Sequence, residues 1–322
     1  MESGKWKRIE EKIMEEKVLR NVLEINDLVV SFEMYQKGFR KKKLEVLHSL
    51  SLDVKEGEIV AVVGSSGSGK SVLAHAVLGL LPKNATMTGN IKYQGELLTP
   101  KERKKYQGRE IAFIPQSVDY LDPLMKVGKQ VVGVYSSKER QRQLFEKYQL
   151  KKEVEDMYPF QLSGGMARRI LISAAVTEEP KLIIADEPTP GLNVELAMDT
   201  LRHFRKLADN GTSILMITHD IDLAFQVADR IAVFYAGTIV EISPTGDFLA
   251  GGKNLRHPYS KAFITALPQN EFQPLKGTQP YAGDLPEGCL FAPRCPKADI
   301  ACNGKIAMRD LREGKVRCIH AT

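Results

Sequence analysis

A short glycine-rich stretch constrains the fold of this 322-residue chain more than any other feature. The sequence "GSSGSGKS" follows the apolar run "EIVAVVG" and precedes "SVLAHAVLGLL", which has helical spacing. Glycines let successive backbone N–H groups face one anion, and the N-terminus of the next helix adds partial positive charge. The pattern G-x-x-x-x-G-K-S between a strand and a helix therefore predicts a phosphate-binding loop. Its residues are Gly64, Ser65, Ser66, Gly67, Ser68, Gly69, Lys70 and Ser71.

Side chains of this loop and of a later strand give the site its predicted chemistry. Lys70 is expected to reach the β- and γ-phosphates of a nucleotide, and the Ser71 hydroxyl to bind Mg²⁺. A second apolar run, "KLIIADEP", delivers Asp186 to the end of a buried strand, where a carboxylate can also bind Mg²⁺. Glu187 comes next and is predicted to be the base that positions the attacking water.

Strand-like and helix-like segments alternate along most of the chain, which predicts a mostly parallel sheet wrapped by helices. Two alternating segments before the loop predict an antiparallel strand pair joined by a basic turn. After Ser243 the chain becomes rich in Pro and Gly, which places a boundary near residue 250. The expected strands are 22–32, 45–54, 58–64, 181–188, 212–220 and a strand–turn–strand at 230–242; the turn is 35–43, and helices are expected at 71–81 and over most of 119–160.

The composition excludes several other classes of protein. No run of 18 apolar residues occurs, so the sequence predicts no membrane-spanning helix. The charged N-terminus is unlike a signal peptide, and it predicts a short amphipathic helix through Trp6, Ile9, Ile13 and Met14. A net charge of +6 is too mild to indicate nucleic-acid binding. These features favour a cytosolic, reducing setting.

A five-residue motif separates this chain from other proteins with a phosphate-binding loop. The sequence "LSGGM", formed by Leu162, Ser163, Gly164, Gly165 and Met166, closely resembles the signature of ATP-binding cassette (ABC) ATPases. Ser163 is expected to cap the helix that begins at the two glycines. The resemblance implies that two cassettes meet head-to-tail, and that each signature closes over ATP held by the other cassette.

The same resemblance assigns further residues over about 22–250. Gln116, in "IPQ", corresponds to the glutamine that contacts Mg²⁺ and senses the membrane partner, and His219, in "THD", to the histidine that contacts the γ-phosphate. Phe39, with Tyr35 in reserve, is expected to stack on adenine. The loop "PTPGLN" departs from the family because Asn193 stands where Asp is usual, which puts communication between the two ATP sites in doubt.

All four cysteines lie near the C-terminus, in a tail that resembles the ATPase subunits of oligopeptide, dipeptide and nickel importers through "RHPYSKAFITALP" and "GCLFAPRCPKA". Their spacing, C-x5-C-x6-C-x15-C, lacks the tight C-x2-C pair common at zinc sites. Four separated thiolates favour a structural [4Fe–4S] cluster; zinc, free thiols and disulfides stay open. His320 is a candidate for an extra ligand, although we expect it to be exposed to solvent. The cysteines are Cys289, Cys295, Cys302 and Cys318.

Together these patterns predict a P-loop ABC cassette of the α/β class with an antiparallel subdomain and a helical subdomain, plus a small irregular cysteine-rich lobe. The expected function is ATP hydrolysis that energises peptide uptake; a nickel or metal-chelate importer, or a soluble ABC ATPase, is the alternative. Expected partners are a second, non-identical cassette, two transmembrane permease subunits and, indirectly, an extracytoplasmic substrate-binding protein. The chain is expected at the cytoplasmic face of the membrane, and no nucleic acid is expected among its partners. The expected parts are residues 1–21 (an extension), 22–250 (the cassette, with a helical subdomain at about 117–178) and 251–322 (the C-terminal domain).

Overall fold

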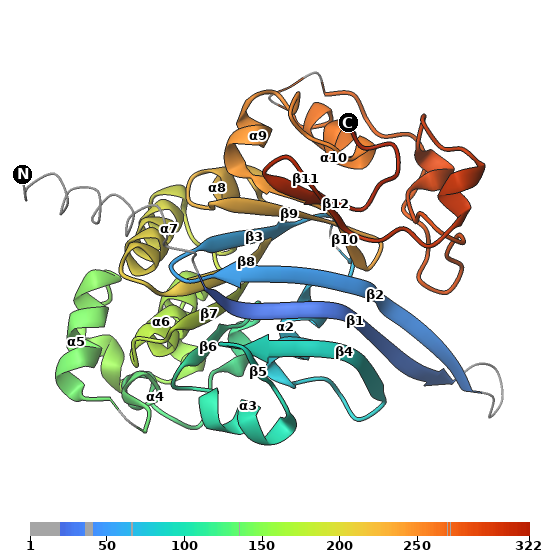
Figure 1. Ribbon diagram of the computed structural model, residues 1–322. Coiled ribbons are helices and arrows are strands. Elements are labelled where there is room, and N and C mark those ends of the chain that lie inside the picture. Colours follow the sequence, from blue (N-terminus) through green and yellow to red (C-terminus); the bar gives the residue numbers. More distant parts are fainter. Residues whose placement is uncertain (1–19, 36–40, 66, 135, 269, 271) are drawn as a thin grey trace, which may run out of the picture.

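The computed structural model contains two β-sheets, with helices packed on the larger one (Figure 1). Three expectations fall on residues that it does not describe: the amphipathic helix at the N-terminus, Ser66 and Phe39. The described residues are 20–35, 41–65, 67–134, 136–268, 270 and 272–322.

The larger sheet has eight strands in the order β11-β12-β10-β9-β3-β8-β7-β6. The five neighbouring strands β9, β3, β8, β7 and β6 run parallel to one another. Their side chains are almost all buried because both faces of the sheet are covered. The expected mostly parallel sheet is therefore confirmed. Its strands are β3 (Ile59–Val63), β6 (Ile111–Ile114), β7 (Leu182–Asp186), β8 (Ser213–Thr218), β9 (Arg230–Tyr235), β10 (Thr238–Pro244), β11 (Arg309–Leu311) and β12 (Gly314–Val316).

The smaller sheet is antiparallel and has the order β2-β1-β4-β5. It contains the expected strand pair, but both strands are longer than the sequence indicated, because Lys41 to Lys43 continue β2 instead of forming the turn. Apolar side chains from this sheet pack against β3, β8 and β9. Its strands are β1 (Asn21–Tyr35), β2 (Lys41–Lys55), β4 (Ala85–Tyr93) and β5 (Glu96–Leu97).

The helices cover the other face of the large sheet or connect its strands. The segment 119–160, which we expected to be largely helical, contains α4, α5 and several 3₁₀ turns, which Pro123 and Gly133 keep short. No helix among the described residues is both long and apolar enough to cross a bilayer. The α-helices are α2 (Lys70–Leu78), α3 (Pro100–Tyr106), α4 (Val127–Val132), α5 (Lys138–Lys147), α6 (Gly164–Val176), α7 (Val194–Asp209), α8 (Ile221–Phe225), α9 (Thr245–Leu249) and α10 (Pro258–Thr265).

The chain beyond residue 250 returns to the large sheet. The hairpin β11–β12 pairs with β10 and becomes its outer edge (Figure 1). Phe291 is 1% exposed and lies against the rings of Tyr235 and Tyr259, so this region shares the cassette's core. The division near residue 250 stays a prediction about domains, but the large sheet includes strands from both sides of it.

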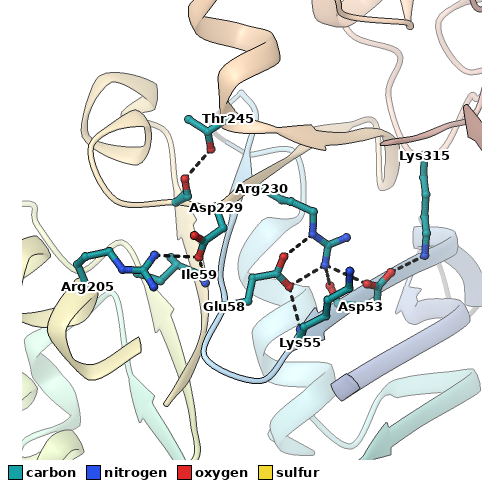
Figure 2. Close-up of polar contacts among 10 residues, drawn as sticks. Asp53, Lys55, Glu58, Ile59, Arg205, Asp229, Arg230, Thr245 and Lys315 are labelled. Atoms are coloured by element: carbon teal, nitrogen blue, oxygen red, sulfur yellow. Dashed lines mark hydrogen bonds and ion pairs between the residues drawn. The ribbon is translucent and has the colours of Figure 1, made fainter. Parts of the chain in front are cut away.

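A buried charge network ties the hairpin to both sheets (Figure 2). The Arg230 guanidinium on β9 bonds to Glu58 at 2.5 Å and to Asp53 at 2.9 Å, and Lys315 on β12 bonds to Asp53 at 2.5 Å. Burial alone would raise the pKa of Asp53, but Arg230 and Lys315 outweigh burial, and its pKa is lowered. The network therefore couples β2, β3, β9 and β12.

Candidate functional site

The phosphate loop lies between β3 and α2, as the sequence predicted, and two of its glycines have backbones that suit only glycine. Gly67 has a φ of 73° and Gly69 a φ of 105°. Gly64 is required for a different reason: a Cβ there would lie 2.5 Å from the Phe234 carbonyl oxygen on β9. The loop thus turns tightly at the carboxyl end of the parallel strands, where α/β proteins bind ligands.

Lys70 opens α2, and its ammonium is directed back along the loop. Its Nζ donates to the carbonyl oxygens of Gly64 at 2.8 Å and Ser65 at 2.9 Å. Burial lowers the pKa of Lys70, while Glu187 and Asp186 act in the opposite direction. A desolvated cation held only by neutral carbonyl groups is a strong binding partner for a phosphate.

Two carboxylates face the loop from the end of β7. Asp186 is 1% exposed, and Glu187 has a φ of 49°, a strained backbone that typically occurs at functional sites. Among the described residues, Asp186 Oδ1, Glu187 Oε2 and Ser68 Oγ have no hydrogen-bond partner. Burial raises the pKa of Asp186, with Glu187 adding to this effect. Unpaired buried oxygens beside a nucleotide loop fit a bound divalent cation such as Mg²⁺.

His219 follows β8 and reaches the same place. Its Nδ1 lies 2.9 Å from Glu187 Oε1. The His219 side chain is 60% exposed, whereas that of Glu187 is 8% exposed. The structure therefore brings together Lys70, Asp186, Glu187 and His219, which the sequence analysis assigned separately.

The signature motif lies at the surface. Ser163 Oγ accepts a hydrogen bond from the Met166 backbone N–H at 3.3 Å and caps α6, which confirms the expected cap. Ser163 and Gly164 are exposed. Arg168 on the same helix donates to the backbone carbonyl oxygens of Pro115 and Gln116. Gln116 is exposed, so the signature helix holds the loop that carries it at the protein surface.

Asn193 has a local structural role that the sequence analysis missed. Its Oδ1 accepts from the Leu196 N–H at 2.9 Å and caps α7. The preference of Asn for this position was the available signal. Just before it, the carbonyl oxygen of Gly191 lies 3.1 Å from where a Cβ on Gly165 would be. The loop "PTPGLN" therefore packs directly on the signature.

The C-terminal region also reaches the phosphate loop, which no sequence signal indicated. The Ser65 hydroxyl donates to Gln279 Oε1 at 2.9 Å, and Lys42 donates to the Gly283 carbonyl oxygen at 3.3 Å. The reserve aromatic, Tyr35, is 72% exposed at the end of β1. It is therefore accessible to a ligand.

The four cysteines converge although they lie on separate loops. The Cys289 N–H donates to the Cys302 carbonyl oxygen at 2.8 Å, and the charge of each of the other three cysteines acts on the pKa of Cys318. Burial raises the pKa of the Cys289 thiol, while backbone N–H groups of Phe291 and Ala292 lower it in part. The four thiols form one cluster, with N–H groups directed at a sulfur.

One possible metal-ligand set overlaps this cluster. Asp299, Cys302 and His320 offer ligand atoms that lie within 4.8 Å of one another, and no such set of three cysteines occurs in the described chain. His320, which we expected to be exposed, is half-buried with its Nε2 3.1 Å from Asp299 Oδ2. That expectation was wrong because the last turn of the chain folds back onto residues near 299.

Comparison with protein families gives two matches along the chain. Residues 47–190 match the family "ABC transporter", and residues 240–302 match "Oligopeptide/dipeptide transporter, C-terminal region". The first match contains the phosphate loop, the signature and both carboxylates. The second contains the first three cysteines.

Full-length relatives match almost end to end. The oligopeptide transport ATP-binding protein AppD of Bacillus subtilis is 34% identical over 308 residues, covering 88% of this chain and 91% of the relative. The dipeptide transport ATP-binding protein DppD of Escherichia coli is 35% identical over 322 residues, covering 93% and 96%. A solved dimeric, post-hydrolysis structure of the ATP-binding cassette MJ0796 with ADP and Pi superimposes with a TM-score of 0.62 at 25% identity, covering 69% of this chain and 98% of that one.

Proposed function

We propose a function that follows from the family of this chain. The chain belongs to the ABC transporter family, among the ATP-binding proteins of oligopeptide and dipeptide transporters. The chain is an ATPase subunit that energises the uptake of oligopeptides or dipeptides through separate transmembrane subunits. The observation that carries this proposal is the meeting of Lys70, Asp186, Glu187 and His219 at the phosphate loop.

Each of these residues has a distinct task in the proposed reaction. Lys70 and the loop N–H groups bind the phosphates, while Ser71, Asp186 and Gln116 would hold Mg²⁺. Glu187 accepts a proton from the attacking water, and the bond to His219 orients its carboxylate. Mg²⁺ neutralises the charge that develops on the phosphates when it is bound.

The surface position of the signature supports a second cassette as partner. Leu162 to Met166 lie across the start of α6 with Ser163 and Gly164 open to solvent, far in sequence from the loop of the same chain. We propose that they close over ATP held by the other cassette. A non-identical partner is proposed because Asn193 removes a charge that the family usually places beside this interface.

Exposed apolar side chains that follow Gln116 in the sequence support docking to the permease subunits. Tyr120, Leu124, Met125 and Val134 are 54%, 88%, 40% and 86% exposed. Exposed apolar side chains gathered in one region mark interaction sites. We propose that a permease loop covers this surface, which would place the chain at the cytoplasmic face of the membrane, opposite the substrate-binding protein.

The cysteine cluster suits a [4Fe–4S] centre better than a single zinc ion. Tetrahedral zinc with Zn–S bonds of about 2.3 Å needs sulfur atoms about 3.8 Å apart. No three of the four sulfur atoms all lie within 4.8 Å of one another in the described chain, and a bulkier cluster would accommodate such a spacing. The N–H groups directed at Cys289 would also stabilise a cluster sulfur ligand. We propose that a [4Fe–4S] cluster cross-links the loops of the C-terminal region and so stabilises it, with zinc as the alternative.

Co-purification and uptake measurements test the transport function. The chain, expressed with its genomic neighbours, should purify with two hydrophobic subunits, and proteoliposomes should accumulate labelled peptide only with internal ATP. Uptake of nickel chelate instead of peptide would support the alternative substrate. ATPase activity without any membrane partner would argue for a soluble ABC ATPase.

A further inference from the structure

An irregular segment of the C-terminal region, residues 275–283, lies against the phosphate loop, and we call it the arm. Its first residues are held by Arg294, whose Nε donates to the Lys276 carbonyl oxygen at 2.9 Å. The same guanidinium donates to the Tyr235 hydroxyl at 3.3 Å. Tyr235 ends β9, the strand next to β3, so the arm starts from the part of the sheet that carries the phosphate loop.

The far end of the arm is attached to β2. Lys42 Nζ donates to the Gly283 carbonyl oxygen at 3.3 Å. The same strand supports the phosphate loop, because Val46 Cγ1 lies 3.2 Å from where a Cβ on Gly69 would be. The arm is thus fixed at both ends to elements that border the loop, and its middle spans the distance between them.

Gln279 lies between these two attachments and contacts the loop directly. Its Oε1 accepts from the Ser65 hydroxyl at 2.9 Å. Gln279 precedes Pro280, and the residue before a proline is restricted to extended backbone. An amide on a restricted backbone, in an arm fixed at both ends, loses little conformational entropy when it forms a hydrogen bond. The sequence of the arm therefore favours this contact.

Ser65 is the residue of the loop at which three hydrogen bonds meet. Its carbonyl oxygen accepts from Lys70 Nζ at 2.9 Å and from the Ser68 backbone N–H at 3.4 Å. Its hydroxyl donates to Gln279. Because the hydroxyl and the carbonyl group belong to one residue, holding the hydroxyl restricts the peptide group that accepts from Lys70. Gln279 therefore acts on the Lys70 ammonium through Ser65.

We propose that Gln279 is a positioning residue for ATP binding. By fixing Ser65 it holds the loop and the Lys70 ammonium in the arrangement that receives the phosphates, so the loop loses less conformational entropy when ATP binds. The contact is made to the phosphate loop, so it affects all nucleoside triphosphates equally, whatever their base. The proposal rests on the ATP site, and it stands whether or not the chain transports peptides.

Calorimetric titration of the full-length chain with MgATP tests the proposal. Gln279→Met keeps the length of the side chain but replaces the amide with a weak acceptor, and it should bind ATP about two- to tenfold more weakly, the worth of one neutral hydrogen bond. In the assembled complex, KM for ATP should rise by a similar factor while kcat stays unchanged. Gln273→Met, at an exposed position just before the arm, is the matched control and should bind ATP with wild-type affinity. Melting temperatures verify folding.

A double-mutant cycle separates an effect through Ser65 from a general effect of the arm. Ser65→Ala should weaken ATP binding by a factor comparable to that of Gln279→Met, and the double variant should bind no more weakly than either single variant. The affinity for GTP, which has the same triphosphate, should fall by the same factor as the affinity for ATP.

Three outcomes would overturn the role of Gln279: unchanged ATP affinity of Gln279→Met, additive losses in the double variant, or a loss for ATP that GTP does not show, which would place Gln279 at the base. In each of them the wild type still binds ATP, so the nucleotide site itself stands. Failure of the wild type to bind MgATP would instead remove the nucleotide site and this proposal with it.

Discussion

His219 Nδ1 lies 2.9 Å from Glu187 Oε1, although the two residues follow different strands. They meet because β7 and β8 are adjacent and parallel, so their carboxyl ends lie at one edge of the sheet. The bond occupies one oxygen of Glu187 and leaves Oε2 without a described partner. A carboxylate that is oriented on one side and unpaired on the other is arranged to accept a proton.

Glu187→Gln should retain ATP binding but slow ATP turnover by about 10²–10⁴-fold, because the amide cannot accept the proton of the attacking water. Steady-state phosphate release by the assembled complex measures this effect. Glu153→Gln, at an exposed position, is the control and should hydrolyse ATP normally. Near-normal ATP turnover by Glu187→Gln would show that hydrolysis occurs mainly in the partner cassette.

Lys70→Ala should abolish tight ATP binding, because it removes the one mobile cation from the loop. Filter binding with labelled ATP provides the measurement. Lys83→Ala, at an exposed position, changes the net charge by the same amount and is the control; it should bind ATP with wild-type affinity. Unchanged affinity of the Lys70 variant would show that the phosphates lie elsewhere.

Ser163→Arg should block hydrolysis in the mixed dimer while leaving ATP binding by this chain intact. The bulky cation disrupts the signature, which is proposed to act on the partner's ATP. Binding to the isolated chain and turnover by the complex are measured on the same preparation. If the isolated variant lost its own ATP binding, the head-to-tail arrangement would be contradicted.

Asp53→Asn should lower the free energy of unfolding at pH 7 by about 1.5–3 kcal/mol, the usual contribution of a hydrogen bond to a charged group. The folded-state pKa of Asp53 is lowered, so its contribution is complete above the unfolded pKa of about 3.9 and is lost as the pH falls through the lower folded pKa. Thermal melts from pH 7 to pH 3 should therefore show the two proteins converging in acid. A constant difference across that range would exclude this ion pair as the cause.

The wild-type protein, purified without oxygen, should absorb near 400 nm because its thiolates bind iron. Cys295→Ser should lose this absorbance, and its residues 270–322 should become sensitive to protease. Iron and acid-labile sulfide should each fall from about four per wild-type chain. ATP binding should survive, because the phosphate loop rests on the parallel sheet. One zinc and no iron in the wild type would replace the cluster, and four freely alkylated thiols would exclude both metals.

The central strands were predictable because burial on both faces demands continuous apolar runs. "IVAVV" in β3 and "LIIAD" in β7 are such runs, and the residues that follow each strand form the candidate site. The order of strands in the sheet then brings Lys70, Asp186 and His219 together without further information. Local sequence and parallel pairing thus account for the nucleotide site.

The C-terminal hairpin was missed for an equally physical reason. "RDL" in β11 and "GKV" in β12 are too short and too polar to show a two-residue period, and they become strands only by pairing with β10. The contact of Ser65 with Gln279 joins residues 214 positions apart and leaves no periodic trace. Pairing between short polar segments that are far apart in the sequence cannot be predicted from hydrophobic periodicity.

The pairing of β12 with β10 has a consequence for association between molecules. Glu241 and Ile242 pair with Val316 and Lys315, which lie far along the chain from them. When the β11–β12 hairpin is detached, β10 is an open sheet edge, the kind of surface on which partly folded chains associate. Docking of the hairpin therefore protects the protein against aggregation as well as closing its sheet.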